Sequence, residues 1–293
     1  MNELSWAPYH SMRGALLLAA VSRRAGVLRG LCATTVSPLQ IEQFPALSDN
    51  YGYLVHNPVM GLTAAIDTPE VSPIVEACAK RGWSLTHIFN THHHADHAGG
   101  NAELKALFPG STVIGPAGEQ AKIPTIDTPV RGGEAFDFGG LEVKVLDVGG
   151  HTLGHIAYYV PVAGVAFVGD SLFALGCGRI FEGTPSQAWA SLQRLAALPP
   201  ETLVFCAHEY TEANLRFALT VEPQNEALQE RAKEIAALRA EGKPTVPTTI
   251  GLELATNPFL RPSSALLRSH LKVPDDESDE ATFARVRKMK DNA

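Results

Sequence analysis

The chain has 293 residues, of which 45% are hydrophobic and 19% are charged, a balance typical of a folded protein with a substantial core. Its formal net charge of −7 argues against nucleic acid as the main partner, and no apolar run approaches the roughly 20 residues that span a bilayer. The 4 cysteines are scattered without a C-x-x-C pair, so neither a disulfide framework nor a thiolate metal site is predicted.

Residues 1–36 differ in composition from the rest of the chain. No acidic residue occurs between Glu3 and Glu42, while several arginines lie among Ala, Leu, Ser and Gly. This composition is typical of an organellar transit peptide. We therefore predict a leader that directs the protein to the mitochondrial matrix, with a plastid or the cytoplasm as alternatives. An untargeted disordered extension is the other interpretation.

From residue 39 to about residue 208, short strands alternate with helices. Strands are predicted at residues 40–44, 51–56, 62–66, 85–90, 112–115, 134–138, 141–146, 155–162, 164–169 and 203–206, and helices at 71–81, 102–107 and 185–198. The last helix begins with Thr184-Pro185-Ser186-Gln187, which has the spacing of a capping box. This alternation predicts two sheets or another layered α/β arrangement, and the pattern alone does not choose between them.

The pattern changes after residue 209. Helices are predicted at residues 212–219, 225–241, 263–271 and 280–290, with a break at Gly242-Lys243-Pro244. We therefore place a domain boundary near residue 209, which gives a first domain at residues 37–208 and a smaller helical domain at residues 209–293.

The segment Thr91-His92-His93-His94-Ala95-Asp96-His97 places four imidazoles and a carboxylate close together. In an extended segment, His92 and His94 point the same way and His93 points the other way. The aspartate and the last histidine fall where Ala98-Gly99-Gly100 predicts a turn into the next helix. Two ligand pairs that face different directions suit a site for two metal ions. The alternative is an exposed histidine-rich loop, which the added aspartate and histidine disfavour.

Three later segments offer further ligands. Each places a polar side chain at the end of a predicted strand, namely His151, Asp170 and His208. Taken singly, each of these could cap a turn or sit at a sheet edge as a hydrogen-bonded residue. Together with the first segment they give the order T-H-x-H-x-D-H, G-H-T-x-G-H, G-D and a later histidine, which favours a shared metal site.

This order of motifs resembles the signature of the metallo-β-lactamase superfamily. Four further segments resemble the hydroxyacylglutathione hydrolases, or glyoxalase II: Asp49-Asn50-Tyr51, the run from Gly176 to Gly183, the run from Ala207 to Thr211, and the run from Asn257 to Arg261. The match runs from about Leu39 to the C-terminus. It implies an α/β fold, a metallo-β-lactamase-type αββα sandwich followed by a small α-helical C-terminal domain that binds substrate.

The same resemblance implies two divalent metal ions per chain, with Zn²⁺ expected and Fe or Mn as alternatives. The first ion would be held by His92, His94 and His151, the second by Asp96, His97 and His208, and Asp170 would bridge the two. His93 and His155 are not ligands in this scheme. We expect His93 to point away from the metals and His155 to lie in the core or behind the ligands.

The implied reaction is hydrolysis of the thioester S-D-lactoylglutathione to D-lactate and glutathione, the second step of methylglyoxal detoxification. A hydroxide held between the metals would be the nucleophile, with Asp96 and Asp170 as the catalytic carboxylates. The family pattern assigns substrate contacts to Arg179, Phe181, Tyr210, Arg261 and Ser264. Some relatives have a tyrosine in place of Phe181 and a lysine in place of Ser264, so a weaker hold on glutathione is expected. We expect a monomer.

Two other functions compete with this one. A mononuclear iron dioxygenase of the same superfamily, acting on glutathione persulfide, would use a similar first motif, but His208 and the helical C-terminal domain are expected only in the thioesterase. A metal-binding scaffold without activity is disfavoured because no ligand position is lost.

Overall fold

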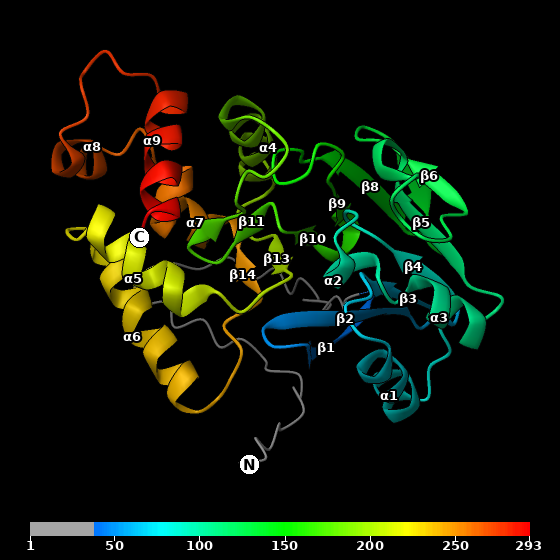
Figure 1. The fold of residues 1–293 in the computed structure, drawn as a ribbon. Coiled ribbons are helices and arrows are strands. Elements are labelled where there is room, and N and C mark those ends of the chain that lie inside the picture. Colours follow the sequence, from blue (N-terminus) through cyan, green and yellow to red (C-terminus); the bar gives the residue numbers. More distant parts are fainter. Residues whose placement is uncertain (1–37) are drawn as a thin grey trace, which may run out of the picture. The chain divides into compact units, whose positions relative to one another are not determined.

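Two six-stranded sheets form the framework of residues 38–293, the part of the chain that the computed structural model describes (Figure 1). The predicted leader lies outside these residues, so its targeting role stays a prediction. The first sheet has the strand order β1-β2-β3-β4-β5-β6 and the second has the order β14-β13-β10-β9-β8-β7. A small hairpin of β11 and β12 follows β10.

The bounds of the strands are as follows. The first sheet contains β1 (Gln40–Ala46), β2 (Asn50–Asn57), β3 (Leu62–Ile66), β4 (His87–Phe89), β5 (Thr112–Pro116) and β6 (Thr128–Val130). The second contains β7 (Ala135–Asp137), β8 (Glu142–Asp147), β9 (Ile156–Val160), β10 (Val165–Gly169), β13 (Leu203–Cys206) and β14 (Thr248–Thr249). The hairpin is β11 (Leu172–Phe173) and β12 (Gly176–Cys177).

Helices cover the outer face of the first sheet. They are α1 (Val71–Arg81) and α3 (Asn101–Leu107), and the short α2 (Ala95–Ala98) precedes α3. On α1, Ile74, Ala77 and Cys78 recur at helical spacing and are buried against the sheet together with Leu104 of α3. This apolar face explains why the segment forms a helix that lies on a sheet.

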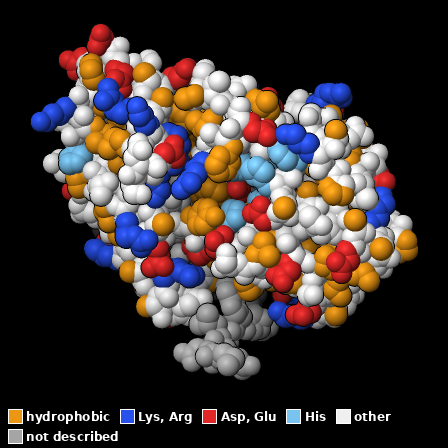
Figure 2. All heavy atoms as spheres, viewed as in Figure 1, with side chains coloured by type: hydrophobic (Ala, Val, Ile, Leu, Met, Phe, Trp, Pro, Cys, Tyr) orange, Lys and Arg blue, Asp and Glu red, His pale blue; other side chains and the backbone are white. Residues whose placement is uncertain are grey.

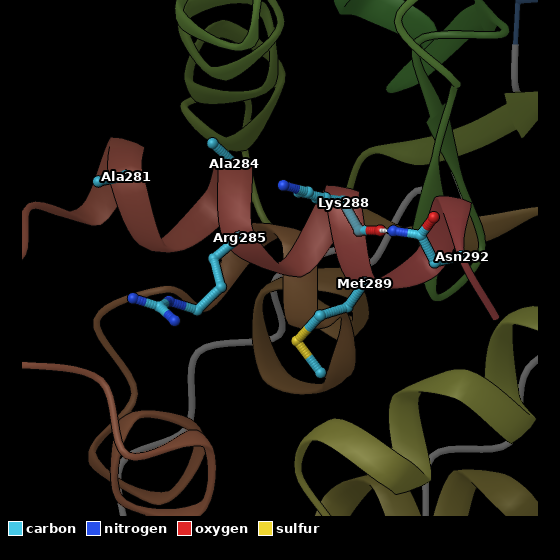
Figure 3. Close-up of a pocket in the computed structure, with 6 residues that line it drawn as sticks. All are labelled: Ala281, Ala284, Arg285, Lys288, Met289 and Asn292. Atoms are coloured by element: carbon cyan, nitrogen blue, oxygen red, sulfur yellow. Dashed lines mark hydrogen bonds between the residues drawn. The ribbon is translucent and has the colours of Figure 1, made fainter.

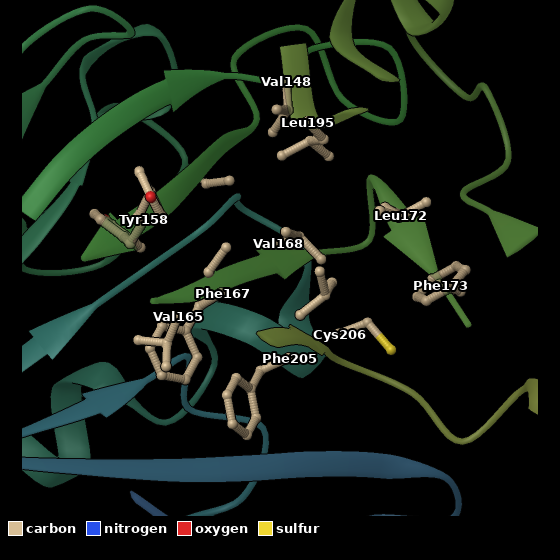
Figure 4. Close-up of a cluster of buried hydrophobic side chains, with 14 of the residues drawn as sticks. Val148, Tyr158, Val165, Phe167, Val168, Leu172, Phe173, Leu195, Phe205 and Cys206 are labelled. Atoms are coloured by element: carbon tan, nitrogen blue, oxygen red, sulfur yellow. The ribbon is translucent and has the colours of Figure 1, made fainter. Parts of the chain in front are cut away.

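The main core lies between the two sheets. Figure 4 shows part of it, with Tyr158 of β9 and Phe167 of β10 packed near Phe205 of β13. The buried hydroxyl of Tyr158 donates to the Asn90 carbonyl oxygen at 2.7 Å, so this polar group is satisfied inside the core. Helix α4 (Pro185–Ala196) begins with the predicted capping box, in which Thr184 and Gln187 bond reciprocally.

The C-terminal part is helical and joins the second sheet directly. It contains α5 (Thr211–Val221), α6 (Glu226–Ala240), α7 (Ile250–Thr256), α8 (Ala265–Leu271) and α9 (Asp279–Asp291). Strand β14, just before α7, pairs with β13. The buried ion pair between Arg231 of α6 and Glu253 of α7 ties these helices together. None of the helices in residues 38–293 is long and apolar enough to cross a membrane.

The predicted fold class is confirmed: two sheets with outer helices are followed by a helical C-terminal segment. Six short strands and α-helices of the described residues were missed, namely β6, β11, β12, β14, α2 and α7. Pro129 in β6 and Pro247 before β14 disfavour strands, because proline cannot donate a ladder hydrogen bond. Both strands pair at a sheet edge, where one missing donor costs little.

Candidate metal centre and substrate pocket

Four connections end at one edge of the two sheets and bring the predicted ligands together. They are the loop and α2 after β4, the turn before β9, the end of β10 and the end of β13. Gly169 precedes Asp170 with a φ of +50°, and a Cβ there would lie 2.6 Å from Thr91 Oγ1. Only glycine fits this backbone, which places the Asp170 carboxylate between the other segments.

One group of ligand atoms gathers around His94. The His94 Nδ1 lies 3.0 Å from His92 Nε2 and 3.1 Å from His151 Nε2. The Oδ2 of Asp170 lies 3.4 Å from the same His151 nitrogen. Ligands bound to one zinc ion lie roughly 3.0 to 3.5 Å from each other, since each is about 2.0 to 2.2 Å from the metal. The spacing therefore suits one ion.

A second group lies on the other side of Asp170. His208 Nε2 is 3.3 Å from Asp170 Oδ1 and 3.5 Å from Asp96 Oδ2. His97 Nε2 is 3.5 Å from the same Asp170 oxygen and 3.4 Å from the same Asp96 oxygen. Thus the two oxygens of the Asp170 carboxylate face two different sets of nitrogens.

The outer nitrogens of these histidines are held by oxygen atoms. His97 Nδ1 donates to Asp67 at 2.8 Å, His208 Nδ1 to Asp49 at 2.7 Å, and His151 Nδ1 to the Arg179 carbonyl at 2.9 Å. Carboxylates and carbonyls only accept, so each ring carries a proton on Nδ1, which leaves Nε2 as the atom that can bind a metal at the centre. Asp67 and Asp49 had not been assigned a role from the sequence.

Two observations show that this donor set fits a metal. His97 Nε2 and Asp170 Oδ1 are buried and have no hydrogen-bond partner among residues 38–293. Burial and the neighbouring imidazoles of His97 and His155 hold the pKa of His92 well below its ordinary value, so that ring is neutral. Although burial alone would raise the pKa of Asp170, the charges of His97 and His208 lower it, so the carboxylate is ionised. Burial would lower the pKa of His97 and His208, but Asp170 and the other neighbouring carboxylates raise both, so a metal at Nε2 would displace a proton from each ring. Neutral imidazoles and ionised carboxylates are the forms that bind metal.

The two histidines excluded from the ligand set lie as expected. His93 turns away from the cluster, and its Nδ1 lies 2.8 Å from Glu119 Oε2. His155 is fully buried, stacks on the His92 ring at 4.5 Å, and accepts from the Asp170 backbone N–H at 3.1 Å. His155 therefore supports two ligands from behind.

A pocket of about 490 Å³ opens beside the cluster. His151 and Asp170 line one end of it, together with the predicted substrate residues Arg179, Phe181 and Tyr210. In Figure 2, histidines and an acidic side chain lie at this hollow, with lysine and arginine side chains on the side of the C-terminal helices. A second hollow of about 490 Å³, along the outer face of α9, contains no histidine, acid or cysteine (Figure 3). The first hollow is therefore the candidate active site.

The part of the pocket that α9 lines is basic. Arg287 and Lys290 of α9 line it beside Arg179. Lys290 Nζ donates to the Ala213 carbonyl at 3.1 Å, and no carboxylate of residues 38–293 pairs with it. Burial and the charges of Arg287, Arg216 and Arg179 lower the pKa of Lys290. Arg287 is paired with Asp291 at 2.8 Å, so Lys290 and Arg179 are the positive charges of this pocket that an anionic ligand would neutralise.

Two family models match the chain. One is described as hydroxyacylglutathione hydrolase C-terminus, at residues 209–293, and the other as metallo-beta-lactamase superfamily, at residues 75–208. A hydroxyacylglutathione hydrolase from Maricaulis maris is 52% identical over 88% of this chain and 100% of its own length. One from Brucella ovis is 56% identical over 86% of this chain and 98% of its own. This chain belongs to the hydroxyacylglutathione hydrolase family.

Two solved structures are similar in fold to this member of the hydroxyacylglutathione hydrolase family. ETHE1 from Myxococcus xanthus is 27% identical with a TM-score of 0.59, covering 86% of this chain and 99% of its own. The protein TTHA1623, crystallised in a di-iron-bound form, is 27% identical with a TM-score of 0.53, covering 74% of this chain and 98% of its own. The fold and the His/Asp cluster together imply that the protein binds divalent metal.

Two residues assigned to the substrate from the sequence lie elsewhere. Arg261 forms a two-pronged ion pair with Glu222, at 2.8 and 2.9 Å, and does not line the pocket. Ser264 caps α8 and also bonds to Glu222. Both therefore stabilise the helical domain, and the basic side chains that line the pocket are Arg179, Arg287 and Lys290. The signal for this was available: Phe283, Arg287 and Lys290 share one face of α9.

Substitution of Arg261 is accordingly expected to affect stability. Arg261→Ala leaves the Glu222 carboxylate, whose side chain is 0% exposed, without its cation. Removing one partner of a buried ion pair costs about 3 kcal/mol or more. We expect a loss of this size in the free energy of unfolding, measured with urea, while KM stays unchanged. An unchanged unfolding curve with a raised KM would restore Arg261 to the substrate site.

Proposed function

We propose that this protein hydrolyses S-D-lactoylglutathione to D-lactate and glutathione at two divalent metal ions. The observation that carries the proposal is the position of Asp170, whose two oxygens face the two ligand groups. The pocket beside it is lined both by the metal ligands His151 and Asp170 and by the basic residues Arg179 and Lys290, so one substrate could contact both groups. Family membership supports the same reaction.

The donor set supports two ions and zinc as the expected metal. His92, His94 and His151 would hold the first, while Asp96, His97 and His208 would hold the second, with Asp170 shared. The di-iron form of TTHA1623 is consistent with a two-metal centre on this fold. Ligands made of imidazole and carboxylate also accept iron and manganese. When bound, two such ions would supply a hydroxide at neutral pH and stabilise the oxyanion of the thioester.

The protein's own residues would orient the substrate. Lys290 and Arg179, which line the pocket, suit the carboxylate groups of glutathione. Burial, Asp49 and Asp170 raise the pKa of Tyr210 to about 12, so its phenol stays a hydrogen-bond donor beside His208. Phe181 offers an apolar ring at the pocket mouth, 5.2 Å from the His151 ring. No strong general acid is required, because glutathione thiolate leaves readily.

The test is to measure metal content and activity on one sample. We expect about two metal ions per chain by elemental analysis and rapid loss of thioester absorbance from S-D-lactoylglutathione. Removal of metal with a chelator should abolish the reaction, and added Zn²⁺ should restore it. One iron per chain, consumption of dissolved oxygen in the presence of glutathione persulfide, and no thioester hydrolysis would instead support the dioxygenase.

A further inference from the structure

Glu119 is a buried carboxylate with no role in the proposed reaction. It ends the short 3-10 turn Ala117–Glu119 after β5, and its residue exposure is 3%. Three hydrogen-bond donors converge on it, from His93, Thr152 and Gly154. A buried carboxylate is costly unless it is bonded in this way, so the site is built around it.

One oxygen of Glu119 holds the first ligand loop. Its Oε2 lies 2.8 Å from His93 Nδ1, which must carry the shared proton because a carboxylate only accepts. His93 lies between the ligands His92 and His94 in the chain. Fixing the outward side of this loop fixes the direction in which its two neighbours point inward.

The other oxygen holds the second ligand loop. Glu119 Oε1 accepts from the Thr152 hydroxyl and, at 2.9 Å, from the Gly154 N–H. Thr152 follows His151 directly in the chain. A Cβ on Gly154 would lie 2.6 Å from Glu119 Cγ, so the glycine of the G-H-T-x-G-H motif makes room for this carboxylate.

A third metal ion is not the better explanation of this cluster. His93, Glu119 and Glu182 offer ligand atoms close to one another. However, the Lys122 ammonium lies 3.0 Å from Glu182 Oε1 and 3.5 Å from His93 Nε2, so a cation is already supplied by the chain. Glu119 also already accepts three hydrogen bonds from the chain.

We propose that Glu119 is a positioning residue that locks the His92–His94 loop to the His151 loop and so sets the metal affinity of the first ligand group. The proposal rests on the proposed function only in requiring that the cluster bind metal. Residues behind metal ligands commonly change metal affinity by about 10- to 100-fold.

The experiment compares Zn²⁺ affinity, by competition with a chelating dye, in the full-length protein and its variants. Glu119→Gln keeps the size and one acceptor oxygen but loses the acceptor for His93, and we expect affinity about 10-fold weaker. Thr152→Val should weaken it similarly. Glu119→Ala and the double variant with Thr152→Val should lose equal amounts, because both act through one carboxylate. Co²⁺-loaded Glu119→Gln should show an altered visible spectrum.

Glu103→Gln is the matched control, because it makes the same change at an exposed carboxylate in the first turn of α3 that bonds to neither ligand loop. It should bind Zn²⁺ as the wild type does. Wild-type affinity and Co²⁺ spectrum in Glu119→Gln would overturn the proposal, even if thermal stability falls. If Glu119→Ala does not fold, the Zn²⁺ affinities of Glu119→Gln and Thr152→Val test the proposal. Absence of thioesterase activity in the wild type would refute the proposed function and leave the affinity result unaffected.

Discussion

Asp170→Ala is expected to lose both metal ions and nearly all hydrolysis. Among residues 38–293, this carboxylate is the one group whose oxygens lie within 3.5 Å of nitrogens in both ligand sets. Without it, each set keeps three ligands but loses the charge that neutralises part of two dications. Water would then keep a pKa near 15.7 instead of about 7, so the rate should fall by several orders of magnitude.

Metal content by elemental analysis and thioester hydrolysis check this result together. Asp170→Asn keeps one oxygen donor, and we expect it to retain at most one ion per chain. Asp276→Ala removes an exposed aspartate far from the site in the chain and should match the wild type in both measurements. Full metal content in Asp170→Ala would contradict the shared carboxylate.

The ligand set was predictable because most of its geometry is local. His92 and His94 are two residues apart, and Asp96 and His97 follow within one turn. The turn predicted at Asp96 and His97 is the short helix α2, which directs these two side chains toward the second group. The remaining ligands sit at strand ends, and one edge of a layered fold brings such ends together.

The substrate pocket was less predictable because its residues meet only through helix packing. Arg261 belongs to the Asn257–Arg261 motif, but in the fold it forms an ion pair with Glu222. Glu222 lies 39 residues away in the chain, so the sequence does not reveal this pairing. Lys290 belongs to a helix whose many charged residues are typical of an exposed surface helix. In the fold, however, Phe283 and Val286 of this helix are fully buried. Glu119 could not be predicted either, because its three hydrogen-bond donors come from two loops that are distant in the sequence.

Lys290→Glu is expected to raise KM for S-D-lactoylglutathione and to change kcat little. Lys290 lines the pocket from α9 and bonds to the Ala213 carbonyl rather than to a metal ligand, so we expect it to bind a part of the substrate remote from the reacting carbonyl. A hydrogen bond to a charged group is worth about 1.5 to 3 kcal/mol, which corresponds to a KM about 10- to 150-fold higher, and the reversed charge adds repulsion.

Steady-state kinetics at constant ionic strength provide the measurement, and Lys288→Glu provides the control. The Lys288→Glu substitution changes the charge of the same helix by the same amount, but the Lys288 side chain lines the other hollow (Figure 3). Equal effects of the two variants would mean that only the overall charge of α9 matters. A fall in kcat with an unchanged KM in Lys290→Glu would place the glutathione carboxylate elsewhere. A rise in KM confined to Lys290→Glu would assign this ammonium to the peptide part of the substrate.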